Sequence, residues 1–211
     1  MKLKHLLACV VVACAPLVAA AQTNSSVAAE ATYAQTIEKR VGDILALLDL
    51  KDAAKTKPIH DTLVAQYRAL RDWHDANDVK RKGAKGEEAE ALKASLKAIH
   101  EKFLADLAAG LSPEQVEKVK DKMTYGKVQF TYTGYVNEYP GMNDAQKTRV
   151  LELLKDAREE AMDGGSSNEK SAIFNRYKGK INNYLSAQGV SSPKKKKAGA
   201  NVAGSTNAPS H

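Results

Sequence analysis

The fold is decided by the stretch NDAQKTRVLELLKDAREEAMDGGSSNEKSAIFNRYKGKINNYL, which spans residues 143–185. Its first half repeats apolar residues at helical spacing until about Asp163, where two glycines and two serines interrupt the pattern. Glycine ends helices and serine caps the next one, so the stretch predicts two amphipathic helices joined by a tight turn. The expected inner residues are Val150, Leu151, Leu154, Ala157 and Ala161, then Ile173, Phe174, Tyr177, Ile181, Tyr184 and Leu185.

The same spacing continues upstream and predicts three further helices. The connection around Lys80–Gly86 is short, so the second and third of these helices should form an antiparallel hairpin. The apolar stripes of the three helices are Tyr33, Ile37, Val41, Ile44 or Leu45, and Leu48; Ile59, Leu63, Tyr67, Leu70, and Trp73 or His74; and Leu92, Leu96, Ile99, Phe103 and Leu107.

These patterns together predict an all-α, single-domain bundle of five to six helices over residues 27–189. Thr124–Gly141 is the exception, because tyrosines crowd there among Gly126, Gly134 and Pro140. Lys127–Thr133 alternates like a short strand, although no second strand is available to pair with it, and a helical turn over Gly134–Tyr139 stays open. We therefore expect an irregular, aromatic-rich connection packed on the bundle.

Two helix starts carry a complete capping pattern. Ser112 precedes Pro113 and stands three residues before Gln115, and Asn143 stands three residues before Gln146. Such pairs satisfy amide groups at a helix N-terminus reciprocally, so they predict helices that begin at these points.

The first residues are typical of a cleavable signal peptide, predicted over residues 1–21. A short cationic start precedes an apolar run that ends in three alanines. Cleavage would remove both cysteines, leave no membrane-spanning segment, and direct a cysteine-free mature chain to the periplasm or outside the cell. The alternative is a lipoprotein attached at Cys14, since small and apolar residues precede that cysteine.

Residues 190–211 are predicted to be a disordered tail that contains Lys194–Lys197. Much of the formal net charge of +7 comes from this run together with Lys2 and Lys4, so the remaining chain is close to neutral. The basic isoelectric point is therefore no sign of nucleic-acid binding.

No signature of catalysis, of cofactor binding or of metal binding stands out. Gly164–Ser167 lacks the second glycine of a nucleophile elbow, and no phosphate-binding glycine loop occurs. His100-Glu101 begins like a zinc-protease helix, but Leu104 stands where the second histidine is required. We therefore expect no catalytic residues, no cofactor and no metal site.

The candidate binding residues are polar and aromatic groups near the end of the second helix and in the aromatic segment. A carboxylate beside His74 would orient its ring, and Asp78 is better placed for this than Asp75, because it lies one helical turn further on. Aromatic side chains offer faces on which sugar rings stack. The full set is Tyr67, Trp73, His74, Asp75, Tyr125, Tyr132 and Tyr135.

Three segments resemble a family of secreted bacterial proteins known only as a domain of unknown function. They are Lys118–Gly126, Ala157–Ser167 and Tyr177–Leu185, and the resemblance extends from about Ile37 to Gly189. It implies one exported domain, in a family whose members accompany polysaccharide-degrading systems, and it supplies no catalytic residues. Leu111–Gln115 and Met142–Gln146 are also similar to the L-T-x-x-Q signature of periplasmic helical chaperones.

Three functions remain open at this point. The first is a non-catalytic envelope module that binds a glycan or an unfolded polypeptide. The second is a carbohydrate-active enzyme, or an accessory factor in polysaccharide utilisation, with His74, Asp75 and the tyrosines lining a cleft. The third is adhesion to polyanions or surfaces through Lys194–Lys197.

Overall fold

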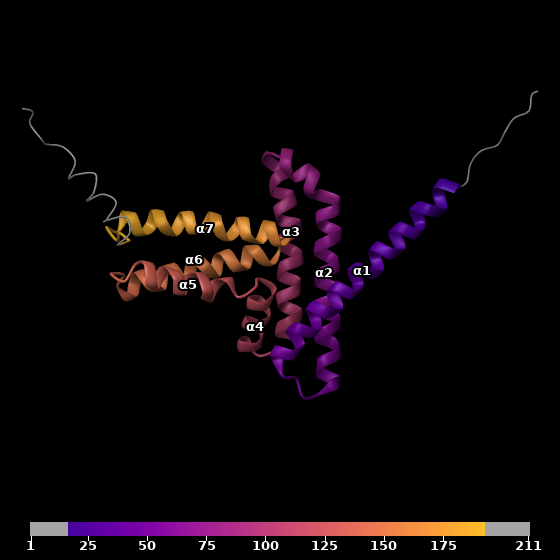
Figure 1. Cartoon of the computed structure of the whole chain (residues 1–211), viewed down its shortest axis with the longest axis horizontal. Helices are drawn as coiled ribbons and strands as arrows, with labels where there is room; N and C mark the ends of the chain where they lie inside the picture. Colours follow the sequence, from indigo (N-terminus) through magenta and orange to yellow (C-terminus); the bar gives the residue numbers. More distant parts are fainter. Residues whose placement is uncertain (1–16, 193–211) are drawn as a thin grey trace, which may run out of the picture. The chain divides into compact units, whose positions relative to one another are not determined.

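The computed structural model describes residues 17–192, with side chains from residue 27 onward, and these residues are helical wherever they have regular structure (Figure 1). The all-α class is confirmed, but the expected number of helices was too low, because the described part contains seven. They are α1 (Leu17–Leu48), α2 (Ala53–Gly83), α3 (Gly86–Ala108), α4 (Pro113–Met123), α5 (Lys127–Glu138), α6 (Asp144–Met162) and α7 (Ser167–Ala187).

Several predictions from the sequence concern residues that the structure does not describe. The first 16 residues of the expected signal peptide, including Cys14, lie outside it, and so does the lysine run Lys194–Lys197. Among the described residues, no helix combines the length and the apolar character that crossing a bilayer requires.

The prediction of an irregular connection over Thr124–Gly141 is wrong, because most of this segment forms α5. Gly126 precedes the helix in the left-handed region, with φ of 62°. Val128, Thr131 and Tyr135 are then buried at helical spacing, and Tyr139 continues the stripe. The alternation of Phe130 and Tyr132 with threonines imitated a strand, but the contacts with the core follow the helical period.

The described residues separate into two compact units, one that ends at Arg40 and one that begins at Val41. The boundary falls inside α1 and inside the range 27–189 that the sequence assigns to one domain, and that assignment stays a prediction. In the first unit, the hydroxyls of Thr32 and Thr36 donate to carbonyls four residues earlier in α1.

In the second unit, α2 and α3 form the predicted antiparallel hairpin, with Ala84 and Lys85 between them (Figure 1). Ile59, Leu63 and Leu70 are buried on α2, and Phe103 and Leu107 are buried on α3. Leu92 and Leu96, at the start of the same α3 stripe, are only half-buried. One end of the hairpin is therefore less completely covered than the other.

The main core cluster lies among α5, α6 and α7, which run side by side (Figure 1). Val150, Leu154 and Ala157 of α6 meet Phe174 and Ile181 of α7 there, as the amphipathic patterns predicted. Each buried aliphatic or aromatic side chain of this kind stabilises the fold by about 1.5–3 kcal/mol.

Both predicted capping boxes are present. The Ser112 side chain accepts from the Gln115 amide, and the Asn143 side chain accepts from the Gln146 amide. In each pair the glutamine side chain accepts in return from the backbone N–H of the capping residue. Each box fixes where its helix begins.

Candidate functional site

The turn between α6 and α7 meets α2 at a very close approach. A Cβ atom added to Gly165 would lie 2.8 Å from Cγ of His74, closer than real side chains approach one another. Only glycine fits against this ring without displacing it. Ser166 accepts from the Glu169 amide at the start of α7, which holds the turn in place.

His74 is held from both sides. Its Nδ1 lies 2.8 Å from Oδ1 of Asp78, and its Nε2 lies 2.7 Å from the backbone oxygen of Asp163. The preference for Asp78 over Asp75 is therefore confirmed, and Asp75 is exposed. Because both ring nitrogens are engaged and the residue is 5% exposed, His74 positions the turn.

Arg81 forms a second tie between α2 and the start of α7. Its guanidinium lies 2.7 Å from Glu169 and 3.1 Å from Asp78. The same guanidinium lies 5.9 Å from the ring centre of Trp73. Trp73 donates from its indole nitrogen to Oγ of Ser95 at 2.9 Å, which links α2 to α3.

His100 ties α3 to the end of α6. Its Nδ1 lies 3.0 Å from Oδ1 of Asp163, and its Nε2 lies 3.6 Å from Oε2 of Glu159. The bond to Asp163 and the contact with Glu159 raise the pKa of His100 to about 9, against the opposing effect of burial. The His100 ring is therefore cationic at neutral pH.

The two carboxyl groups beside His100 are shifted in opposite directions. Burial acts to raise the pKa of Glu159, but contacts with His100 and Lys120 and the charge of Arg158 lower it to about 2. Burial raises the pKa of Asp163, against the opposing effect of its bond to His100. Opposite shifts in neighbouring carboxyl groups are also a feature of acid–base pairs in enzymes.

Charged side chains of α4 form further ion pairs with Glu159 and with its neighbour Arg158. Lys120 donates to Glu159 at 2.9 Å, and Arg158 contacts Asp121 and Glu117 at 2.7 Å each. Arg158 is only 3% exposed, so this pairing is what makes its burial tolerable. The ion pairs therefore connect α3, α4 and α6 into one network.

Lys170 is a buried cation near the same turn. Its ammonium donates to the backbone oxygen of Met123 at 3.1 Å and to that of Met162 at 3.4 Å. These carbonyls end α4 and α6, where helix dipoles favour positive charge. Lys170 thus joins the C-termini of two helices.

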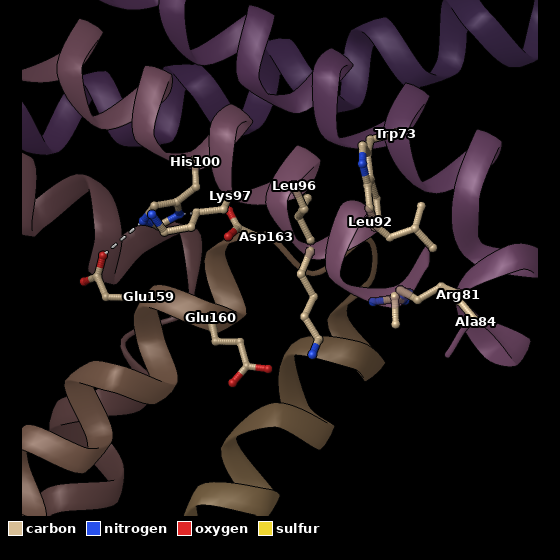
Figure 2. Close-up of a pocket in the computed structure, with 12 residues that line it drawn as sticks. Trp73, Arg81, Ala84, Leu92, Leu96, Lys97, His100, Glu159, Glu160 and Asp163 are labelled. Atoms are coloured by element: carbon tan, nitrogen blue, oxygen red, sulfur yellow. Dashed lines mark hydrogen bonds and ion pairs between the residues drawn. The ribbon is translucent and has the colours of Figure 1, made fainter. Parts of the chain in front are cut away.

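A hollow of about 670 Å³ opens between α2, α3 and α6, along the edge of this network. Figure 2 shows Trp73, Arg81 and Ala84 at one end, and His100, Glu159 and Asp163 at the other, with Leu92 and Leu96 between them. Ala89, Lys93, Lys97 and Glu160 complete the lining. The floor is apolar and the charges lie around it.

The predicted binding residues do not converge on this hollow. Trp73 lines it, and His74 packs edge-on against Trp73 with ring centres 5.0 Å apart. Tyr67 is half-buried on α2. Tyr125, Tyr132 and Tyr135 are not among its lining residues: Tyr125 is 53% exposed with φ of 60°, and the other two pack at the core of α5–α7. Their roles in binding stay predictions.

Sequence reasoning missed the residues that build the site around His100. No acidic partner was predicted for His100, and Asp163 and Glu159 were not singled out. The available signal was that both acids precede the two glycines in Ala157–Ser167, one of the segments that carried the family resemblance. Among the described residues, no group of three or more acidic, histidine or cysteine side chains is arranged to hold a metal ion.

The fold and the site define a helical protein that has an ion-paired junction beside an apolar hollow. The chain belongs to the family described as Protein of unknown function (DUF3826), whose model matches residues 34–202. This confirms the predicted membership of a domain-of-unknown-function family. No curated protein sequence matches the chain.

Proposed function

We propose that this protein is a non-catalytic binding module of the cell envelope, and that it holds an amphipathic segment of polypeptide in the hollow between α2, α3 and α6. The single observation that carries this proposal is the incomplete cover of the apolar stripe on α3. Its second half, at Phe103 and Leu107, is buried. Its first half, at Leu92 and Leu96, forms the floor of the hollow.

A helical segment laid on this floor would complete the packing that the hairpin begins. Leu92 and Leu96 are one turn apart, so they present a continuous apolar ridge along α3. Trp73, Ala84 and Ala89 extend that surface. Amphipathic helices bind apolar grooves of this kind through residues at the same spacing.

Charges on the α3 side of the floor suit one polar flank of such a segment. Lys93 and Lys97 stand on α3, whereas Glu159 and Glu160 stand on α6. A helix with acidic residues along one flank would meet Lys93 and Lys97, whose ion pairs with Glu90 and Glu101 are exposed and weak, whereas Glu159 and Glu160 are already paired with cations of the protein. Charges at the rim of an interface favour the correct orientation more than they raise affinity.

The engagement of the charged groups supports binding rather than catalysis. Glu159 contacts three cations, His100 lies between two carboxylates, and Glu160 pairs with Arg176. Separating one of these ion pairs costs free energy, because a partly buried charge would remain unpaired. The paired groups are therefore poorly suited to exchange protons with a substrate. Location in the envelope rests on the predicted signal peptide, and N-terminal sequencing of the protein recovered from cells tests it.

The binding proposal is tested with a fluorescently labelled amphipathic helical peptide made of leucine, lysine and glutamate. We expect Leu96→Glu to weaken binding by about tenfold or more, because it places a carboxylate on the apolar floor. The control is Val79→Glu on α2, because Val79 is 83% exposed and does not line the hollow. Equal loss in both variants, or no binding by the unaltered protein, would contradict the proposal.

The opposite pKa shifts of Glu159 and Asp163 favour one second candidate, an enzyme that acts on a polysaccharide. In that function Asp163, whose raised pKa favours the protonated form, would donate a proton, and Glu159, which stays ionised, would stabilise positive charge that develops on the sugar ring. Release of reducing ends from a polysaccharide, lost in both Glu159→Gln and Asp163→Asn, would support this candidate. Release that persists in both variants would exclude it.

A further inference from the structure

A second hollow lies between α5 and α7, and none of its lining residues lines the first. Its volume is about 680 Å³. Most of its polar lining consists of neutral amide and hydroxyl side chains: Gln129, Thr131, Thr133, Asn137 and Asn182. Glu138 and Lys178 are the charged members, one of each sign. The chemistry therefore favours a ligand without net charge that forms many hydrogen bonds.

Phe130 provides an aromatic face at this hollow. It is 82% exposed, so it contributes little to the core of the protein. Gly134 lies one helical turn further along α5 and also lines the hollow. A Cβ atom at Gly134 would meet nothing within 4 Å, so the packing of the fold does not require glycine there. Since glycine is a poor helix former, its presence leaves an open backbone surface beside the ring at some cost to α5.

The fold sets the orientation of one hydrogen-bond donor in this hollow, the side-chain NH₂ group of Asn182. The Tyr135 hydroxyl lies 2.9 Å from Oδ1 of Asn182 and 3.1 Å from the backbone oxygen of Lys178. Because the amide oxygen of Asn182 accepts from Tyr135, its NH₂ group points elsewhere and is available as a donor. Tyr135 is 7% exposed, so the orientation is set from inside the fold.

We infer that the hollow between α5 and α7 binds a short neutral saccharide. The hydroxyls of a sugar ring both donate and accept, which suits a lining of amides and hydroxyls. The C–H face of the ring packs on an aromatic side chain, and Phe130 beside the open surface at Gly134 offers such a platform. A polypeptide segment would instead need several apolar pockets for its side chains, and this lining has one exposed aromatic ring. The inference does not depend on the polypeptide site proposed for the first hollow.

The test is titration of the full-length protein, followed by nuclear magnetic resonance, with neutral oligosaccharides of glucose, xylose and mannose. An oligogalacturonate serves as the acidic probe, and an extended peptide of serine, asparagine and alanine serves as the polypeptide probe. We expect at least one neutral saccharide to shift the backbone signals of Phe130 and Gly134 and the side-chain NH₂ signals of Asn182. Phe130→Ala and Gly134→Leu should each weaken this binding by about tenfold, because one removes the platform and the other covers the surface beside it.

Val79→Ala is the matched control, because it removes an exposed apolar side chain from α2. It should leave saccharide affinity unchanged, and thermal melting should show that all three variants remain folded. The inference is overturned if no neutral saccharide shifts these signals, if only the oligogalacturonate or the peptide does so, or if Phe130→Ala and Gly134→Leu bind as well as Val79→Ala.

Discussion

The hollow beside α3 and the hollow between α5 and α7 use their polar groups in opposite ways. Beside the first, His100, Glu159 and Asp163 are charged or strongly shifted groups that bond to one another and join separate helices. In the second, the amides of Asn137 and Asn182 are exposed at the surface. The difference teaches that ion pairs between charged side chains mark the structural junction, whereas the exposed hydrogen-bonding groups of the second hollow are mostly neutral amides and hydroxyls.

The largest expected effect is a loss of stability at alkaline pH. Deprotonation of His100 would break its ion pairs with Asp163 and Glu159 beside the first hollow. The folded-state pKa of His100 is raised from 6.5 to about 9, so its stabilising contribution is complete below pH 6.5 and is lost as the pH rises through about 9. A shift of this size contributes up to about 3 kcal/mol to the free energy of unfolding. Denaturant unfolding at a series of pH values measures it.

His100→Gln is the control for this prediction, and it should remove most of the alkaline decline. A decline of equal size in the variant would show that His100 is not its cause. Glu159 acts at the acidic end: its contribution is present above pH 4.5 and is lost as the pH falls through about 2. The variant should still lose stability at acidic pH, but less than the unaltered protein, because Lys120 and Arg158 remain beside Glu159 while its bond to His100 is gone.

The next effect concerns the glycine at the junction. Gly165→Ala should destabilise the fold by about 2 kcal/mol, because the added Cβ overlaps a ring that hydrogen bonds hold in place. Thermal unfolding measures this change. In a protein that already carries His74→Ala the same substitution should cost far less, and an equal cost in both backgrounds would contradict the proposed clash.

A smaller effect is expected in the second hollow from Tyr135→Phe. The variant loses the hydroxyl that bonds to Asn182, at a cost of about 1 kcal/mol in the free energy of unfolding. Burial raises the pKa of the Tyr135 hydroxyl to about 12, which indicates that it stays protonated across the usual pH range. If chemical denaturation detects no change in stability, the hydroxyl has no such role.

The smallest effect sharpens the contrast between the two glycines. Gly134→Ala should stabilise the protein by up to about 1 kcal/mol, because the new methyl group meets no neighbour and alanine favours a helix. Thermal unfolding of Gly134→Ala beside Gly165→Ala should give shifts of opposite sign. A destabilised Gly134→Ala would show that the fold itself requires this glycine.

The amphipathic helices could be predicted from the sequence because their signals are local. Val150, Leu154 and Ala157 repeat at helical spacing, and Asn143 with Gln146 fixes the start of α6. The pairing of His74 with Asp78 followed for the same reason, since one helical turn separates the two residues. A local pattern also gave the wrong prediction at Phe130 and Tyr132. These aromatic residues alternate with threonines as in a strand, although the segment forms α5.

The junction could not be predicted, because its contacts join residues distant in the sequence. His100 and Asp163 are 63 positions apart, and Arg158 meets Glu117 across 41. No local pattern specifies which acid reaches which base. The candidate tyrosines were grouped for their chemistry alone, and α5 then directed Tyr135 toward the core while Tyr125 remained at the surface.

Hydrogen–deuterium exchange along α3 tests the proposed polypeptide site most directly, because it reports which residues a bound segment covers. With the amphipathic peptide at saturation, the amides around Leu92 and Leu96 should exchange more slowly, while those of α5 should not change. Unchanged exchange around Leu92 and Leu96 in the presence of bound peptide would contradict the account.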